Sequence, residues 1–138
     1  MKNYFKCLEI QIQTIGENNK LIAITYSNIG SVYRDQGDYK KALDIFIKCL
    51  EIQKQTIGEN NPAVADTFNS IGSVYDIKED YNKAMENYFK CLEIRKQSIG
   101  ENNPATATAY NNIGSVYKNQ GDYKKAMENY FKCLEIQK

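Results

Sequence analysis

The stretch Asn102–Ile136 reads NNPATATAYNNIGSVYKNQGDYKKAMENYFKCLEI and contains the signals for two consecutive helices. Asn103 is a favourable N-cap residue, and Pro104 suits the first helical position, where its missing N–H costs nothing. Apolar residues then recur at three- and four-residue spacing, which is the period of an amphipathic helix. Gly121 suits the end of this helix and Asp122 the N-cap of a second one. The stretch therefore predicts a helix-turn-helix unit.

Small residues recur where the two helices of this unit would meet. Gly114 lies in the first helix, and Ala126 and Cys133 lie in the second. Tyr117 and Tyr130 are large enough to fill the space beside them. Small side chains let two helix axes approach closely, so a larger residue at Ala126 should overpack the contact at a cost of about 1–3 kcal/mol.

The unit recurs with a period of 42 residues. The segment 84–94, AMENYFKCLEI, is identical to the segment 126–136, and the four cysteines are separated by 42 positions each. A fixed period of this size marks a repeat architecture, in which each unit shares one core with its neighbours. The predicted packing positions are Gly30, Tyr33, Ala42 and Cys49, then Gly72, Tyr75, Ala84 and Cys91, then Gly114, Tyr117, Ala126 and Cys133.

We expect an all-α chain forming a single array over residues 1–138. The predicted parts are a helix of the second type at 1–15 and three repeats at 20–57, 61–99 and 103–138.

Glu79 stands where the other two repeats have Gly37 and Gly121. Either this turn holds a non-glycine residue in the left-handed region, at a cost of about 1 kcal/mol, or it adopts another geometry.

The overall charge argues against two classes of partner. The chain has 18 basic and 17 acidic residues, so its overall charge suggests no attraction to nucleic acid or to an acidic membrane surface. No apolar run approaches the roughly 18–20 residues that span a bilayer, and the amino terminus lacks the pattern of a signal segment. We expect a cytoplasmic protein.

The cysteines are interpreted as packing residues rather than as ligands or disulfide partners. Equivalent positions on stacked repeats lie too far apart for a disulfide, and four thiols suit a reducing compartment. The sequence has no histidine and no CxxC pair, so we expect no metal and no cofactor. It also has no glycine-rich phosphate loop and no nucleophile spaced beside a base, which argues against an enzyme. All four cysteines are expected to be small, buried residues at helix contacts.

The motif G-x-x-Y in the first helix, followed by G-D-Y-x-x-A at the start of the second, resembles the tetratricopeptide repeat. The period of 42 residues and the G-E-N-N-P-A connection resemble the longer variety found in kinesin light chains. The resemblance implies a solenoid with a right-handed superhelix. It also implies a concave groove, lined mainly by the first helix of each repeat, that binds an extended or short helical peptide of a partner protein.

Polar residues of the first helices are the candidate lining of that groove. Asn69 and Asn111 could bracket a peptide bond of the ligand, because an amide side chain offers both donors and an acceptor. The alternative is that these residues are solvated helix positions without a binding role. The row of Arg34, Asp76 and Lys118 has mixed sign, which predicts a partner that is neither strongly acidic nor strongly basic. The full candidate set is Ser27, Ser31, Arg34, Asn69, Ser73, Asp76, Asn111, Ser115 and Lys118.

A self-assembling module is the competing interpretation. Residues 3–11 are identical to residues 129–137, so both ends of the array carry the same second-type helix. Terminal repeats usually need a polar outer face for solubility. The sequence therefore predicts either end-to-end association or exchange of the terminal helices between chains.

Overall fold

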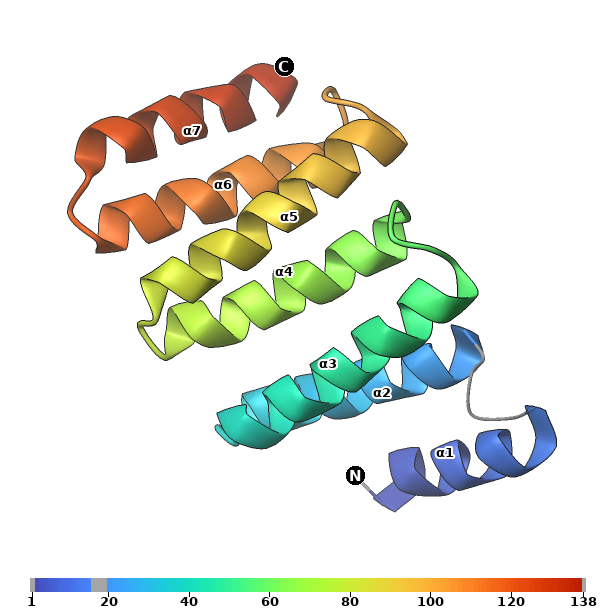
Figure 1. The fold of residues 1–138 in the computed structure, drawn as a ribbon. Helices are drawn as coiled ribbons and strands as arrows, with labels where there is room; N and C mark the ends of the chain where they lie inside the picture. The colour runs from blue at the N-terminus through green and yellow to red at the C-terminus, as the bar shows by residue number, and fades with distance from the viewer. Residues whose placement is uncertain (1, 16–19, 138) are drawn as a thin grey trace. The chain divides into compact units, whose positions relative to one another are not determined.

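The computed structural model describes residues 2–15 and 20–137, and within them the chain is helical (Figure 1). The helices are α1 (Lys2–Ile15), α2 (Lys20–Asp35), α3 (Tyr39–Thr56), α4 (Pro62–Ile77), α5 (Tyr81–Ile99), α6 (Pro104–Asn119) and α7 (Tyr123–Gln137).

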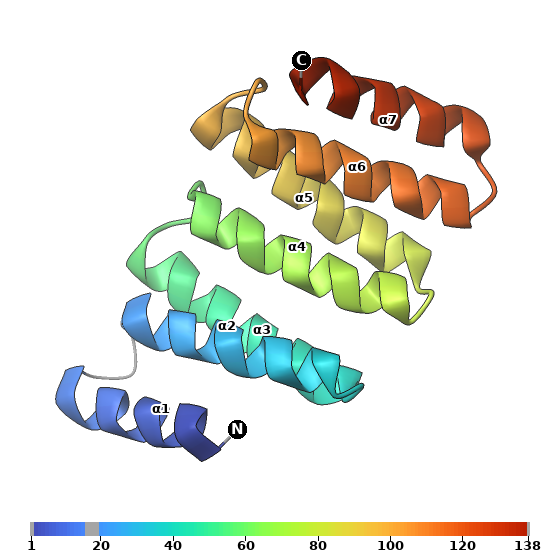
Figure 2. The same ribbon diagram turned by 180° about the vertical axis from the view of Figure 1, so that it is seen from behind.

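The helices form two compact units, Met1–Glu59 and Asn60–Lys138. In the first unit, α2 packs against α3 and also against α1. In the second unit, α4 packs against α5, α5 against α6, and α6 against α7 (Figure 2). The pairs α2–α3, α4–α5 and α6–α7 are the predicted helix-turn-helix units.

The predicted helix starts are confirmed by their caps. Asn103 Oδ1 accepts the N–H of Ala105 at 2.9 Å, with Pro104 at the first helical position of α6. Asn61 caps α4 in the same way. Asp122 Oδ1 accepts a backbone N–H in the first turn of α7 at 3.2 Å. Side-chain capping satisfies N–H groups that have no partner inside the helix.

The three turns between paired helices share one geometry. Gly37 and Gly121 have φ of 82° and 85°, and Glu79 has φ of 64°. The first of the two alternatives for Glu79 is therefore correct, because the turn keeps its left-handed residue although a side chain replaces glycine there.

Replacing Glu79 with glycine should stabilise the second unit. The Glu79→Gly chain loses the left-handed strain, although its unfolded state gains freedom, so we expect a net gain of up to about 1 kcal/mol. Urea unfolding followed by circular dichroism measures the change, and Gly121→Glu is the matched opposite that should lower stability. Equal or lower stability of Glu79→Gly would show that the strain at Glu79 does not exceed the entropic cost of glycine in the unfolded chain.

The first helix of each repeat approaches the second most closely at a glycine. A Cβ atom on Gly30, Gly72 or Gly114 would lie 2.6 Å, 2.8 Å or 2.9 Å from the nearest ring atom of the facing residue. Those facing residues are Phe46, Tyr88 and Tyr130, respectively. The aromatic rings thus occupy the space that the missing side chains leave open. The residues Ala42, Ala84 and Ala126 are buried at the same contacts.

The cysteines do not share one environment. Cys49, Cys91 and Cys133 are buried, whereas Cys7 is exposed, so the prediction of four buried cysteines is wrong for Cys7. Its Sγ lies 4.0 Å from Thr25 Oγ1 on α2, but α2 is the one described helix with an extensive contact to α1, whereas α5, which carries Cys91, packs against both α4 and α6.

Thiol labelling should separate these environments. Burial raises the pKa of the Cys91 thiol to about 11, so at pH 8 only about one such thiol in a thousand is ionised. We expect iodoacetamide to modify Cys7 first and Cys91 only when the second unit opens. Mass spectrometry of peptides after timed labelling measures both rates, and comparable rates at the two residues would contradict the structure.

Candidate functional site

Polar side chains of α4 and α6 meet within the second unit. Asn112 Nδ2 donates a hydrogen bond to Asn69 Oδ1 at 2.8 Å. Further along the same two helices, the side chain of Asn119 is hydrogen-bonded to the carboxylate of Asp76. We call these four residues the polar seam, and it joins the first helices of two consecutive repeats.

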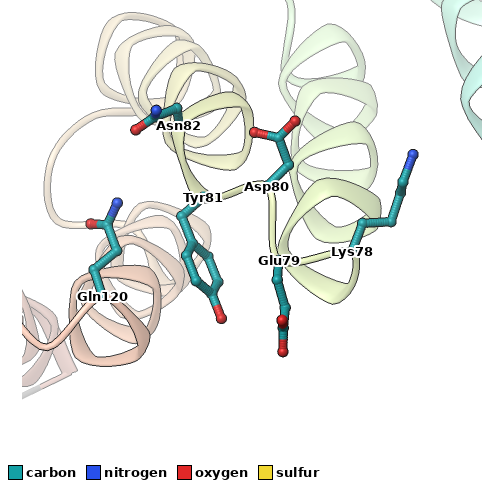
Figure 3. Close-up of a pocket in the computed structure, with 6 residues that line it drawn as sticks. All are labelled: Lys78, Glu79, Asp80, Tyr81, Asn82 and Gln120. Carbon is teal, nitrogen blue, oxygen red and sulfur yellow. The ribbon is translucent and has the colours of Figure 1, made fainter.

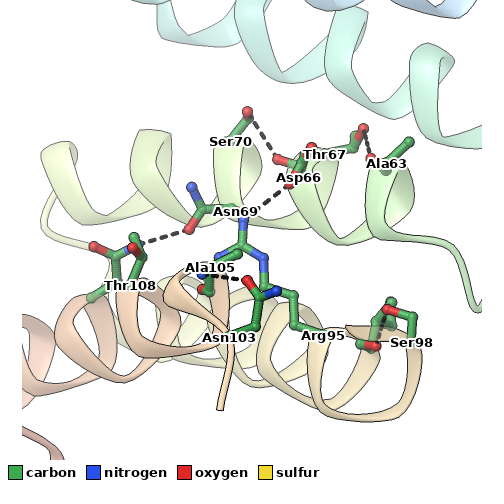
Figure 4. Close-up of polar contacts among 12 residues, drawn as sticks. Ala63, Asp66, Thr67, Asn69, Ser70, Arg95, Ser98, Asn103, Ala105 and Thr108 are labelled. Atoms are coloured by element: carbon green, nitrogen blue, oxygen red, sulfur yellow. Dashed lines mark hydrogen bonds and ion pairs between the residues drawn. The ribbon is translucent and has the colours of Figure 1, made fainter. Parts of the chain in front are cut away.

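The candidate residues of the second unit have different roles around this seam. Asn69, Ser73 and Asp76 are half-buried on α4, whereas Asn111 and Lys118 are exposed on α6. Asn69 accepts its hydrogen bond through Oδ1, which leaves the two N–H groups of the same amide as donors (Figure 4).

Ser115 is held by the second helix of its own repeat. Its Oγ lies 3.1 Å from the hydroxyl of Tyr130, and either atom can donate the hydrogen bond. The hydroxyl of Ser115 therefore contacts a half-buried tyrosine of its own repeat, which makes it a weaker candidate for ligand contact than Asn69 or Asn111.

The remaining candidates lie on α2 in the first unit. Ser27, Ser31 and Arg34 are half-buried, and Arg34 Nε lies 3.5 Å from Asp35 Oδ1. This ion pair links neighbouring residues at the end of α2 and is worth little in water.

Asp76 carries a polar atom without a partner. Its Oδ1 is buried and accepts no hydrogen bond from the part of the chain that the structure describes. Burial raises the pKa of this carboxyl more than the hydrogen bond from Asn119 lowers it. A buried acceptor left unsatisfied costs free energy, so such a group calls for an explanation.

Replacing Asp76 with asparagine should therefore stabilise the free protein at neutral pH. Because the folded pKa is raised, the ionised carboxylate costs stability above that pKa, and the cost disappears below the unfolded value of 3.8. We expect Asp76→Asn to raise the melting temperature at pH 7 and to change it less at pH 3. Scanning calorimetry at both values measures this, and a stabilisation that is larger at pH 3 would contradict it.

Two seam residues, Asn112 and Asn119, are absent from the candidate set drawn from the sequence. The predicted residues occupy three positions of each first helix, and these two asparagines lie directly beside Asn111 and Lys118. Asn112 lies one position beyond the repeat equivalent of Asn69, so it is the stagger of α4 against α6 in the structure that brings the two amides together.

A buried arginine of α5 links α4 to α6 near the polar seam. Arg95 Nη2 lies 3.0 Å from Asp66 Oδ1, and Arg95 Nη1 donates to the carbonyl oxygen of Ala105 at 2.9 Å (Figure 4). Arg95 lies on α5 and contacts α4 and α6 at once, so it fixes the spacing of these two helices. In the sequence, Arg95 is recognisable as a departure from the repeat, because the equivalent positions in other repeats are Gln11 and Gln53.

A hollow of about 430 Å³ lies at the turn between α4 and α5 and is lined by Lys78, Glu79, Asp80, Tyr81, Asn82 and Gln120. Its side chains point apart: Tyr81 and Glu79 extend to one side, Asp80 and Asn82 to the other, and Lys78 away from both (Figure 3). Side chains that diverge do not converge on one ligand, so this hollow is a weaker candidate than the face around the polar seam.

Neither a metal site nor a membrane span stands out in the described parts of the chain. No group of three or more cysteine, aspartate or glutamate side chains there could hold a metal ion. None of the described helices is both long enough and apolar enough to cross a bilayer.

The repeated helix pairs and their glycine–aromatic contacts have a counterpart in a known family. The sequence profile described as tetratricopeptide repeat matches residues 2–46, 21–97 and 78–138. The chain belongs to the tetratricopeptide repeat family. The resemblance inferred from the sequence is confirmed, and tetratricopeptide repeats generally mediate contacts between proteins.

Solved tetratricopeptide structures share the fold. BtubC (BKLC) from P. vanneervenii matches with a TM-score of 0.88 at 22% identity, over 97% of this chain and 54% of that one. A putative kinesin light chain from Podosopora anserina, with nearly identical TPR-like repeats, matches with a TM-score of 0.81 at 16% identity. That match covers 97% of this chain and 64% of the other.

A third solved structure matches this chain over most of the length of both chains. The N-terminal domain of stress-induced protein-1 from C. elegans matches with a TM-score of 0.70 at 19% identity, over 85% of each chain. No curated protein sequence matches the chain. The chain spans little more than half of BtubC and under two thirds of the kinesin light chain, so these likenesses show an all-α helical-repeat fold and no more.

Proposed function

We propose that the chain is a protein-interaction module in which the face of α4 and α6 around the polar seam binds an extended peptide segment of a partner protein. The observation that carries this proposal is the buried, unsatisfied Oδ1 of Asp76 on the same face as the amides of Asn69 and Asn111.

The chemistry of the face suits a peptide backbone. An extended peptide presents one N–H donor and one C=O acceptor per residue. The N–H groups of Asn69 can donate to a ligand carbonyl because Asn112 already occupies its oxygen. Asn111 is exposed and offers both a donor and an acceptor. Such contacts recognise a backbone without requiring a particular side chain.

Asp76 gives the face its preference among ligands. A modest rotation about its terminal torsion, which is broad in aspartate, would let Oδ1 accept an N–H group or a lysine ammonium of the ligand. Binding then removes the cost of the unsatisfied acceptor. Lys118 on α6 has the opposite charge, so we propose a partner segment of mixed charge rather than an acidic or basic tract. No cofactor takes part, and we propose the cytoplasm as the location.

Selection from a random peptide display library tests the proposal. We expect peptides that bind the wild-type chain and lose about fivefold in affinity when Asn111 is replaced with alanine, which is the size of one net hydrogen bond. Fluorescence anisotropy of the labelled peptide measures the affinities, and Asn82→Ala on α5 is the matched control. A peptide that loses affinity only with Asn82→Ala would place the site on the other face.

A further inference from the structure

The contact between α5 and α6 uses a different pair of residues from the contact between α1 and α2. In the α1–α2 contact, Thr25 Oγ1 donates to Gln11 Oε1 at 2.7 Å. The repeat places Arg95 and Ala109 at these two positions in α5 and α6. The larger residue of one helix is thus accompanied by a smaller residue of the other, which keeps the volume of the contact similar. Glutamine and threonine occur together once more in the sequence, as Gln53 and Thr67.

A backbone carbonyl explains why the two residues change together. In two repeats the threonine hydroxyl lies within hydrogen-bonding distance of the carbonyl oxygen four residues earlier, at 3.3 Å from Thr25 to Leu21 and at 3.2 Å from Thr67 to Ala63. The equivalent carbonyl of α6 belongs to Ala105, and Ala109 has no hydroxyl to donate. Arg95 Nη1 donates to this carbonyl instead, at 2.9 Å. The arginine therefore takes the part of both the glutamine and the threonine.

The arginine also reaches a third helix. Arg95 Nη2 lies 3.0 Å from Asp66 Oδ1 on α4 (Figure 4). The equivalents of Asp66 in the other repeats are Ile24 and Thr108, which carry no charge. The side chain of Arg95 is 7% exposed, so the guanidinium makes these contacts inside the helix packing. Arginine, alanine and aspartate together join α4, α5 and α6, whereas the pair of Gln11 and Thr25 joins two helices.

These contacts lie beside the polar seam. Asp66 precedes Asn69 by three residues on α4, so the two side chains are neighbours on one face of the helix. The extensive contacts of α4 and α6 with a common neighbour are those with α5, so α5 sets how the two helices face each other. The hydrogen bond of 2.8 Å from Asn112 to Asn69 depends on that spacing, because such bonds weaken beyond about 3.2 Å.

We propose that Arg95 is a positioning residue of the binding face. By holding Asp66 on α4 and the carbonyl of Ala105 on α6, it fixes the spacing at which Asn112 occupies Asn69 Oδ1. The N–H groups of Asn69 are then directed to the ligand before binding, and a face held in this way loses less entropy when it binds. The effect on affinity rests on the proposed function, whereas the effect on the polar seam requires no ligand.

Exchanging the two residue pairs tests the role of Arg95. Arg95→Gln alone should lower the urea midpoint, because the carbonyl of Ala105 loses the guanidinium. Ala109→Thr alone should also lower it, since Arg95 already fills the contact. The double variant with both substitutions recreates the pair seen between α1 and α2, and we expect it to recover most of the wild-type midpoint. A double variant less stable than either single variant would overturn the equivalence of the two pairs.

The double variant separates stability from positioning, because its glutamine cannot form the ion pair with Asp66. We expect the side-chain amide protons of Asn112 to exchange with solvent about fivefold faster than in wild type, as measured by NMR without ligand. We also expect about fivefold weaker binding of a display-selected peptide, which is the size of one net hydrogen bond. The matched control is the reverse exchange in the first unit, Gln11→Arg with Thr25→Ala, which should leave both quantities unchanged.

The two measurements distinguish this proposal from the proposed function. Wild-type exchange of the Asn112 amide in a stable double variant would overturn the role of Arg95, and the residue would then serve packing alone. Faster exchange with unchanged peptide affinity would support the role of Arg95 in the polar seam and would instead overturn the binding face of the proposed function.

Discussion

Replacing Phe46 with alanine is expected to lower the free energy of unfolding of the first unit by about 3–5 kcal/mol. Phe46 is fully buried, and its ring fills the space over Gly30 between α2 and α3. Losing the ring removes its burial and leaves a cavity that the two helices can only partly close. Urea unfolding combined with hydrogen exchange of the α2 and α3 amides measures the loss and assigns it to the first unit.

The contact between Phe46 and Gly30 predicts that the effect of Gly30→Ala on stability will change sign when the ring of Phe46 is removed. In the wild-type chain, Gly30→Ala places a Cβ atom 2.6 Å from the ring, and the overpacking cost of about 1–3 kcal/mol exceeds the gain in helix propensity. In the Phe46→Ala chain, the same methyl group enters the cavity and should raise stability instead. Equal destabilisation by Gly30→Ala in both backgrounds would show that the glycine is not required by the ring.

The second large effect is expected on ligand binding. A chain carrying Asn69→Ala, Asn111→Ala and Asp76→Lys should bind a selected peptide roughly a hundredfold or more weakly, because two amide contacts and one charge-assisted contact are lost. Isothermal titration calorimetry measures the affinity of each chain.

The control for this triple variant is a double variant that makes the same two kinds of change, amide to alanine and carboxylate to lysine, on the second helices. Asn82→Ala with Glu128→Lys changes exposed residues of α5 and α7, and its affinity should equal that of wild type. If binding survives all three substitutions around the seam, the assignment of the binding face is wrong.

Local features of the fold could be predicted from the sequence because they depend on a few neighbouring residues. The asparagine caps of α4 and α6 and the glycine turns follow from local backbone chemistry, and the helix pairs follow from the repeat. The left-handed conformation of Glu79 could be stated only as an alternative, because the strain of one residue competes with the geometry of the whole turn.

Features that depend on neighbouring helices could not be read in the same way. The period treats Cys7 like the other cysteines, but exposure depends on which helices cover α1. The pairing of Asn112 with Asn69 depends on the stagger of α4 against α6, which the period does not specify. Arg95 stands where other repeats have glutamine. Its contacts with Asp66 and Ala105 could not be predicted from that difference, because they depend on how α4, α5 and α6 are placed.

Nitrogen-15 chemical-shift mapping with the tightest selected peptide tests the proposed binding face most directly. The side-chain amide signals of Asn69 and Asn111 are assigned by their loss in the alanine variants. We predict that both signals shift on titration, together with the backbone amides of α4 and α6 that border the polar seam. Shifts confined to α5 and α7, with the two asparagine side chains unchanged, would contradict the proposal that this face binds the partner.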